Sequence, residues 1–249
     1  MNCYTEIAKS VPEFLALASA IRKNRLPAGT TGLANIHKAH IIASLCMSLM
    51  RKAVVIAPDE AQATRLRQDM EGFGINALLF PARDLSFRSL ETVSREYEHA
   101  RLKVLDKMLS GDFDAVVLSA EAASQLTVPP ARLMGNSFSV EAGGDYDIGE
   151  LTLNLVKCGY TRSEQVDGAG QFAVRGGILD FFPPDSKQPC RIEFWGDSVD
   201  SISFFDPETQ RRTDSAEEIR ITPAREILCE DGVLCEMIKR HIAEKRIKG

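Results

Sequence analysis

The sequence predicts an α/β protein with two domains: a parallel-sheet domain, and an inserted α+β domain whose strands are mainly antiparallel. In residues 1–137, short apolar runs alternate with segments of helical periodicity, which is typical of a parallel sheet covered by crossover helices. In residues 138–222, strand-like runs follow one another and are separated by glycine turns. The boundary is expected after the proline-rich passage PPARLMGN, and residues 223–249 are expected to return to the first domain.

The composition is that of a globular protein without a metal. At 249 residues, 44% of them hydrophobic, the chain can bury a substantial core. No apolar run reaches membrane-spanning length and the N-terminus MNCYTEIAKS lacks the regions of a secretory signal, so we expect a cytoplasmic location and no membrane partner. The six cysteines show no Cys-x-x-Cys pair or zinc spacing, which predicts reduced thiols. His37, His40 and His99 are expected to be ordinary surface or core side chains and not metal ligands.

The charge is unevenly distributed along the chain. The formal net charge is −5, yet residues 138–222 contain 16 acidic and 8 basic residues, which gives this part −8 and the rest of the chain +3. Affinity for nucleic acids comes largely from cationic groups that displace counterions. The second domain is therefore better suited to a protein partner.

The first domain is predicted to contain three buried strands joined by helices. A helix is expected to begin near Pro12, because proline is favoured in a first helical turn and apolar residues follow at helical spacing. The strands are the short apolar runs at residues 53–58, 75–80 and 113–119. The remaining helices are expected at residues 35–50, 59–71 and 95–109.

The segment GTTGLANI has the outline of a phosphate-binding loop, with a short strand expected before it at residues 26–28. A working P-loop needs Gly-x-x-x-x-Gly-Lys-Ser/Thr, because the lysine neutralises phosphates and the hydroxyl binds magnesium. Here Asn35 stands in place of the lysine and Ile36 in place of the Ser/Thr. We therefore expect no nucleotide cofactor, and Gly29 and Gly32 to form only a turn between strand and helix.

In the second domain, a helix is expected to follow Asp147, which is a favourable N-cap, and strands are expected from there to about Thr222. The strand with the clearest pattern lies just before the turn Gly196-Asp197. One of its faces carries Arg191, Glu193 and Trp195, and the other carries Ile192 and Phe194. This alternation is typical of an antiparallel strand that is buried on one face.

Two runs in this domain carry a family resemblance. They are GYTRSEQVDGAGQFAVRGGILDFFPP and CRIEFWGDSVDSISFFDPETQR. Together they resemble the domain by which UvrB and the bacterial transcription-repair coupling factors (Mfd) bind UvrA in nucleotide excision repair, and the coupling factors are the more similar of the two. The run APDEAQATRLRQDM likewise resembles a helicase-like segment of this family.

The resemblance implies a degenerate, helicase-like first domain of the P-loop type and a UvrA-binding second domain. It implies UvrA as the partner, and RNA polymerase and DNA as partners of the full-length protein through regions absent here. UvrB proteins also insert a tyrosine-rich hairpin that clamps DNA, whereas residues 81–98 offer only a short link. This difference favours the coupling factors.

The resemblance also implies which residues contact UvrA. Arg175, in VRGG, is the firmest of these, and Arg162 follows the Gly-Tyr pair of the same domain. Asp180, Phe182 and Arg191 are expected in the same patch. Arginine suits such a surface because its guanidinium binds carboxylates in a bidentate manner. The alternative is that Asp180 pairs internally with Arg175 or Arg191 and that Phe182 belongs to the core.

Two functions remain open from the sequence. The first is a binding module without catalytic residues, which recruits UvrA to stalled transcription complexes. The second is a divergent nucleotide hydrolase or helicase fragment of the UvrB type that uses the glycine turn. The missing lysine and Ser/Thr favour the first, as does the lack of a Walker B run after a buried strand.

Overall fold

The structure is a computed structural model that describes residues 3–83, 95–228 and 231–246. The chain divides into two compact units, Met1–Leu126 and Thr127–Gly249. Residues 127–137 belong to the second unit in this division. The finer domain bounds expected from the sequence, 1–137, 138–222 and 223–249, stay predictions.

The first unit is built on a parallel sheet of three strands. These are β1 (Ala53–Ala57), β2 (Ala77–Phe80) and β3 (Ala115–Ser119), in the order β1-β3-β2. Both pairs are parallel, with Ala115 of β3 opposite Ala53 on one side and Ala77 on the other. The parallel sheet predicted from the alternating pattern is therefore confirmed.

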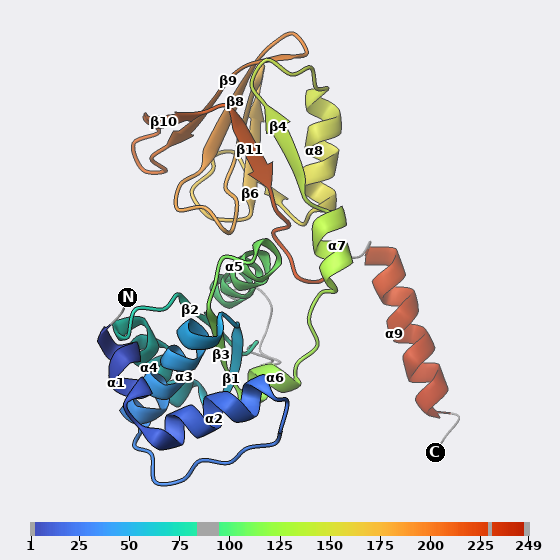
Figure 1. The fold of residues 1–249 in the computed structure, drawn as a ribbon. Helices are drawn as coiled ribbons and strands as arrows, with labels where there is room; N and C mark the ends of the chain where they lie inside the picture. Colours follow the sequence, from blue (N-terminus) through green and yellow to red (C-terminus); the bar gives the residue numbers. More distant parts are fainter. Residues whose placement is uncertain (1–2, 84–94, 229–230, 247–249) are drawn as a thin grey trace. The chain divides into compact units, whose positions relative to one another are not determined.

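Six helices are described in the first unit: α1 (Cys3–Lys9), α2 (Pro12–Arg22), α3 (Asn35–Leu49), α4 (Glu60–Gly72), α5 (Glu96–Ser110) and α6 (Ala120–Ser124). Residues of α3 and α4 pack on one face of the sheet, where Ala39, Ala43 and Ala63 let the helices approach closely. Residues of α5 and α6 pack on the other face (Figure 1). Asp59 caps α4 as expected, since its side chain accepts a hydrogen bond from the backbone N–H of Gln62.

Two sequence predictions for this unit were wrong or incomplete. No strand forms at residues 26–28, because Pro27 has no N–H to donate and no neighbouring strand pairs with this segment. Helix α1 was not predicted. Of the link at residues 81–98, residues 84–94 lie outside the described part of the chain, so the comparison with the UvrB hairpin stays a prediction.

The second unit is built on a six-stranded sheet in the order β10-β9-β8-β7-β6-β5. Its strands are β5 (Thr161–Arg162), β6 (Gln171–Arg175), β7 (Ile178–Phe181), β8 (Cys190–Trp195), β9 (Ser198–Phe205) and β10 (Arg212–Ala216). Every neighbouring pair is antiparallel except β5 with β6. The mainly antiparallel sheet predicted for this part of the chain is confirmed.

Smaller elements complete the second unit. A two-stranded antiparallel ribbon joins β4 (Phe138–Glu141) to β11 (Glu218–Ile221), and the helices are α7 (Pro130–Gly135), α8 (Ile148–Lys157) and α9 (Asp231–Arg246). The predicted N-cap of α8 is present, because the side chain of Asp147 accepts a hydrogen bond from the backbone N–H of Glu150. No helix in the described residues is long and apolar enough to cross a membrane.

The core of the second unit lies between α8 and one face of the six-stranded sheet (Figure 1). Leu151 and Leu155 of α8 join a buried cluster with Phe172, Leu179 and Ile192, which come from β6, β7 and β8. Because side chains alternate along a strand, the residues next to these three in each strand point to the opposite face of the sheet. That opposite face carries the candidate site.

Candidate protein-binding site

We call the sheet face opposite α8 the outer face. Cross-strand pairing places four of its residues in one row, Ala173 opposite Asp180, Asp180 opposite Arg191, and Arg191 opposite Ser203. A second row, nearer to the hairpin turns, contains Arg175, Ile178, Glu193 and Ser201. The outer face is therefore polar and charged at its centre, in contrast to the apolar face under α8.

Asp180 lies at the centre of this face, and its side chain is only 1% exposed. It accepts a hydrogen bond from Nη2 of Arg175 at 2.8 Å. Arg191 donates two more, from Nε to Oδ1 at 2.7 Å and from Nη2 to Oδ2 at 2.9 Å. A buried carboxylate is costly unless it is paired and hydrogen-bonded, and these three bonds meet that need. Asp180 therefore fixes the positions of the two arginine side chains through these hydrogen bonds and is not itself part of the exposed surface.

Arg191 is mainly an internal residue of the site. Its side chain is 14% exposed, and its guanidinium lies 4.6 Å from the ring centroid of Phe205. The hydrogen bond to Asp180 raises the pKa of Arg191 above its ordinary value. The cation is thus fixed between a carboxylate and an aromatic ring, with little surface left for a partner.

Arg175 ends β6 and is the exposed arginine of the pair. Its side chain is 51% exposed, and the single hydrogen bond from Nη2 to Asp180 leaves the other N–H groups of the guanidinium facing solvent. The next residue, Gly176, has a φ of 60°, which glycine adopts without strain in the tight turn to β7. The turn and Asp180 together fix where this guanidinium is presented.

A second ion pair on the outer face involves a residue that the sequence did not indicate. Nη2 of Arg212, from β10, binds Oε1 of Glu193, and the hydroxyl of Ser201 donates to Oε2 at 3.2 Å. The hydrogen bond from Arg212 is the main cause that lowers the pKa of Glu193. Both carboxylates of the two rows, Asp180 and Glu193, are therefore already paired with arginines of the same face.

Phe182 follows β7 and is half-buried. It packs against the small apolar cluster of Val166, Ala173 and Phe205. Its backbone N–H donates to the carbonyl of Gln171 at 3.0 Å, which holds the chain against β6. Most of the Phe182 ring therefore contributes to packing, in line with the alternative that the sequence left open.

Arg162 lies on the other face of the sheet. In the parallel pair of β5 and β6 it stands opposite Phe172, which belongs to the core under α8. It lines an open hollow with Val174 and the first turn of α8. Arg175 points to the same side of the sheet as Ala173, which is the outer face, whereas Arg162 points to the side of Phe172. The two arginines therefore lie on opposite faces of the sheet.

Trp195 ends β8 on the outer face and is 85% exposed. Its strand is held on both sides, because the N–H of the preceding Phe194 donates to the carbonyl of Gly177 at 2.8 Å and Trp195 itself pairs with Ser198. The sequence placed Trp195 on one face with Arg191 and Glu193, but it predicted no functional role for this residue. The signal for such a role is the exposure of its side chain, which the sequence pattern does not reveal.

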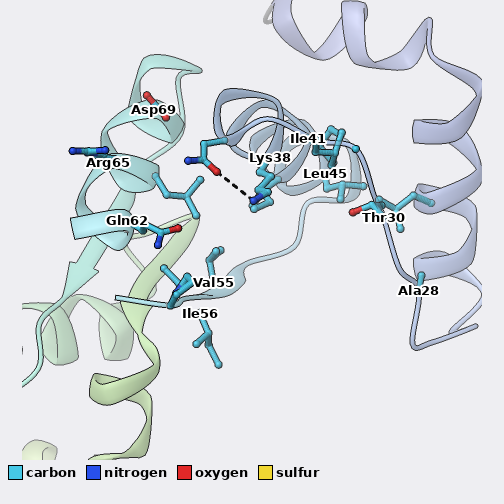
Figure 2. A pocket seen from close by; sticks show the side chains of 18 residues that line it. Ala28, Thr30, Lys38, Ile41, Leu45, Val55, Ile56, Gln62, Arg65 and Asp69 are labelled. Carbon is cyan, nitrogen blue, oxygen red and sulfur yellow. Dashed lines mark hydrogen bonds between the residues drawn. The ribbon is translucent and has the colours of Figure 1, made fainter. Parts of the chain in front are cut away.

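Two of the four residues of the degenerate phosphate loop border a cavity of about 580 Å³ in the first unit, shown in Figure 2. Gly32 and Asn35 line it, whereas Gly29 lines a neighbouring hollow of about 750 Å³. Ile36 lines neither of the two and is exposed. The four residues that the sequence grouped into one loop are thus divided in space.

The cavity is mainly aliphatic, with Ile41, Leu45 and Val55 in its wall. Figure 2 shows Lys38 beside it, and Nζ of this lysine donates a hydrogen bond to Oδ1 of Asn35 at 3.2 Å. Lys38, one helical turn after Asn35, places an ammonium group at this cavity, and the sequence motif did not single it out. Among the described residues, no group of three His, Cys, Asp or Glu side chains is placed to hold a metal ion.

Comparison with known proteins connects the second unit to a described family. Residues 138–227 match the family model of the UvrB interaction domain. The transcription-repair-coupling factor of Myxococcus xanthus is 35% identical over 212 residues, which cover 81% of this chain and 18% of that protein. That of Bacillus subtilis is 29% identical over 208 residues, covering 83% and 17%. That of Staphylococcus aureus (strain Mu50) is 29% identical over 218 residues, covering 86% and 18%.

The match to the UvrB interaction domain includes every strand of the six-stranded sheet, and therefore the whole outer face. The chain spans less than a fifth of the length of the relatives it matches. The family resemblance noted in the sequence is confirmed. The chain thus carries a UvrB interaction domain and resembles the N-terminal, UvrB-like region of the transcription-repair-coupling factors.

Proposed function

We propose that this chain is a non-catalytic module that binds UvrA through the outer face of its UvrB interaction domain. In the full-length protein this binding would recruit UvrA to stalled transcription complexes during transcription-coupled nucleotide excision repair. RNA polymerase and DNA would be bound by regions outside this chain. The observation that carries the proposal is Arg175, a half-exposed guanidinium that a buried carboxylate holds in one position on that face.

Charge supports a protein partner for this face. The two rows and Arg212 contain five charged residues, three arginines and two carboxylates, and both carboxylates are bound by these arginines. This ion-paired group therefore has an excess of one positive charge within a region of net charge −8. An acidic patch on a protein suits that pattern, whereas a polyanionic nucleic acid would be repelled by the rest of the domain.

The competing function is a divergent nucleotide hydrolase that uses the cavity beside Asn35. Lys38 favours it in part, because an ammonium group stands at the cavity. Against it, that ammonium is bound to Asn35, and Ile36 cannot ligate magnesium. We therefore assign the function to the outer face.

The test is direct binding between the 249-residue chain and UvrA. With the chain immobilised, surface plasmon resonance should give saturable UvrA binding in the presence and in the absence of ATP. UvrB should compete, because both proteins would present the same type of domain to one surface of UvrA. Simultaneous binding of UvrB and this chain to one UvrA would contradict the shared surface, and no binding of UvrA would remove the proposal.

A further inference from the structure

The largest exposed aromatic side chain of the second unit lies on the same face as Arg175. Trp195 is 85% exposed although it pairs with Ser198 of β9 and the N–H of the preceding Phe194 donates to the carbonyl of Gly177. The turn after it is tight, with a φ of 64° at Gly196. The indole is thus presented to solvent from a hydrogen-bonded hairpin, and its exposure does not come from a loose end of the chain.

Strand register brings Trp195 and Arg175 to the same end of the outer face. Ile178 stands opposite both Arg175 and Glu193. Trp195 lies two residues beyond Glu193 toward the hairpin turn, so its side chain points to the same face as that of Glu193. Ile178 is only partly buried. This end of the face therefore combines an exposed indole, an aliphatic side chain and an oriented guanidinium.

The charges on this face indicate the chemistry of its partner. Asp180 and Glu193 are bound by arginines of the face, so neither is available to a partner's cation. Arg175 retains N–H groups that Asp180 does not occupy. The matching surface has a carboxylate opposite Arg175 and an apolar side chain opposite the indole.

We infer that Trp195 is a further partner-contact residue: it is the apolar anchor of the interface and becomes buried against a UvrA side chain beside the carboxylate that Arg175 binds. The inference rests on the proposed function, and it adds to it the residue that supplies the apolar contact. Tryptophan and arginine are the side chains most often found at the energetic centre of protein interfaces. A rigid aromatic group also loses little conformational entropy when it binds.

The test uses the fact that Trp195 is the only tryptophan of the chain. Incorporation of 5-fluorotryptophan gives a single ¹⁹F resonance, whose shift between H₂O and D₂O reports exposure of the indole to solvent. Adding unlabelled UvrA should remove most of that solvent shift. The affinity of UvrA for the wild-type chain, measured by surface plasmon resonance, shows independently that the complex forms.

Variants then measure how much the indole contributes. Trp195→Ala should weaken UvrA binding about 30-fold or more, as expected for an interface hot spot, and Trp195→Phe should recover a large part of the affinity because it keeps an aromatic contact. Tyr97→Ala, which removes an exposed aromatic ring in the first unit, is the matched control and should leave affinity unchanged. Circular dichroism should show the wild-type fold for all three variants.

The outcomes separate the inference from the function on which it rests. If UvrA binds while the indole stays exposed and Trp195→Ala keeps its affinity, the inference is wrong and the proposed function stands. If UvrA does not bind the wild-type chain at all, both fall. If a single-stranded oligonucleotide shields the indole and Trp195→Ala weakens that binding, Trp195 is a base-stacking platform and the protein-partner assignment is wrong.

Discussion

Asp180 and Arg191 form a two-point ion pair across β7 and β8, with Nε 2.7 Å from Oδ1 and Nη2 2.9 Å from Oδ2. The two residues stand directly opposite each other in the strand register, so the planar guanidinium meets the carboxylate edge to edge. The same carboxylate also binds Arg175. Loss of Asp180 would therefore affect both the stability of the sheet and the position of the exposed arginine.

Asp180→Asn is expected to destabilise the chain by about 3 kcal/mol, because it leaves the largely buried Arg191 without its counter-charge. It should also weaken UvrA binding at temperatures where the variant is folded, although Asp180 itself is buried. Urea unfolding followed by circular dichroism measures the first effect and surface plasmon resonance the second. Asp200→Asn, on the exposed part of β9, is the control and should change stability by less than about 0.5 kcal/mol. Equal stability of the two variants would contradict the structural role of Asp180.

Arg175 and Arg162 are expected to differ in their effect on UvrA binding, since they lie on opposite faces of the sheet. Arg175→Ala should cost about 2–5 kcal/mol of binding free energy if its partner is a desolvated carboxylate. Arg162→Ala should cost less than about 1 kcal/mol, as expected for a residue outside the interface. Titrations of both variants with UvrA, with circular dichroism as the fold control, decide the matter. Comparable losses would mean that UvrA wraps around both faces, and an unchanged affinity of Arg175→Ala would remove that residue from the site.

Glu193 should make the stability of the second unit depend on pH. Its pKa is lowered in the folded state, chiefly by the hydrogen bond from Arg212, so the ionised carboxylate stabilises the fold. That contribution is complete above the unfolded pKa of about 4.3 and is lost as the pH falls through the lowered folded pKa. Glu193→Gln should therefore unfold at a lower temperature than wild type at pH 7, and the difference should shrink below about pH 4. Glu208→Gln in an exposed turn is the control, and a Glu193→Gln difference that persists at low pH would contradict the pairing.

The chain is expected not to bind Mg-ATP appreciably, because Asn35 supplies no ammonium charge at the P-loop position, the Lys38 ammonium is hydrogen-bonded to Asn35, and Ile36 supplies no magnesium ligand. Asn35→Lys alone should not restore binding, since the hydroxyl that holds the metal would still be missing. Calorimetric titration with Mg-ATP is the measurement. Micromolar binding of Mg-ATP by the wild-type chain would contradict this prediction and favour the hydrolase alternative.

The five cysteines within the described residues should divide into two classes toward thiol reagents. Burial raises the pKa of Cys46 and of Cys158 to about 11, and that of Cys190 to about 12, so these thiols stay protonated at pH 8. Cys3 and Cys235 are exposed. Iodoacetamide at pH 8, followed by peptide mass spectrometry, should modify the two exposed thiols first and the three buried ones only after denaturation. Rapid labelling of Cys190 in the native chain would show that the sheet opens more readily than its burial indicates.

Much of the fold could be predicted because it depends on local pattern. The alternation of Arg191, Glu193 and Trp195 with Ile192 and Phe194 identified the two faces of β8, since a period of two requires no knowledge of the neighbouring strands. The strand expected at residues 26–28 failed for the opposite reason. A strand exists only where a neighbour accepts its hydrogen bonds, and no single stretch of sequence reveals that neighbour.

The candidate site depended on register, which the sequence does not reveal. Whether Asp180 would face a partner or its own arginines was decided by its pairing opposite Arg191. Arg162 and Arg175 were separated by the parallel register of β5 against β6. Arg212 reaches Glu193 from β10, across β9, a contact that no motif in the sequence indicated.

The hydrogen bond between Arg175 and Asp180 has a consequence for the entropy of binding. A free arginine on a surface samples many rotamers, and fixing such a side chain in an interface costs about 0.5–1.5 kcal/mol. Because Asp180 already restrains the guanidinium through Nη2, most of that loss occurs when the sheet folds and not when the partner arrives. The exposed arginine therefore meets its partner in a prepared conformation, and a greater share of the contact energy remains as affinity.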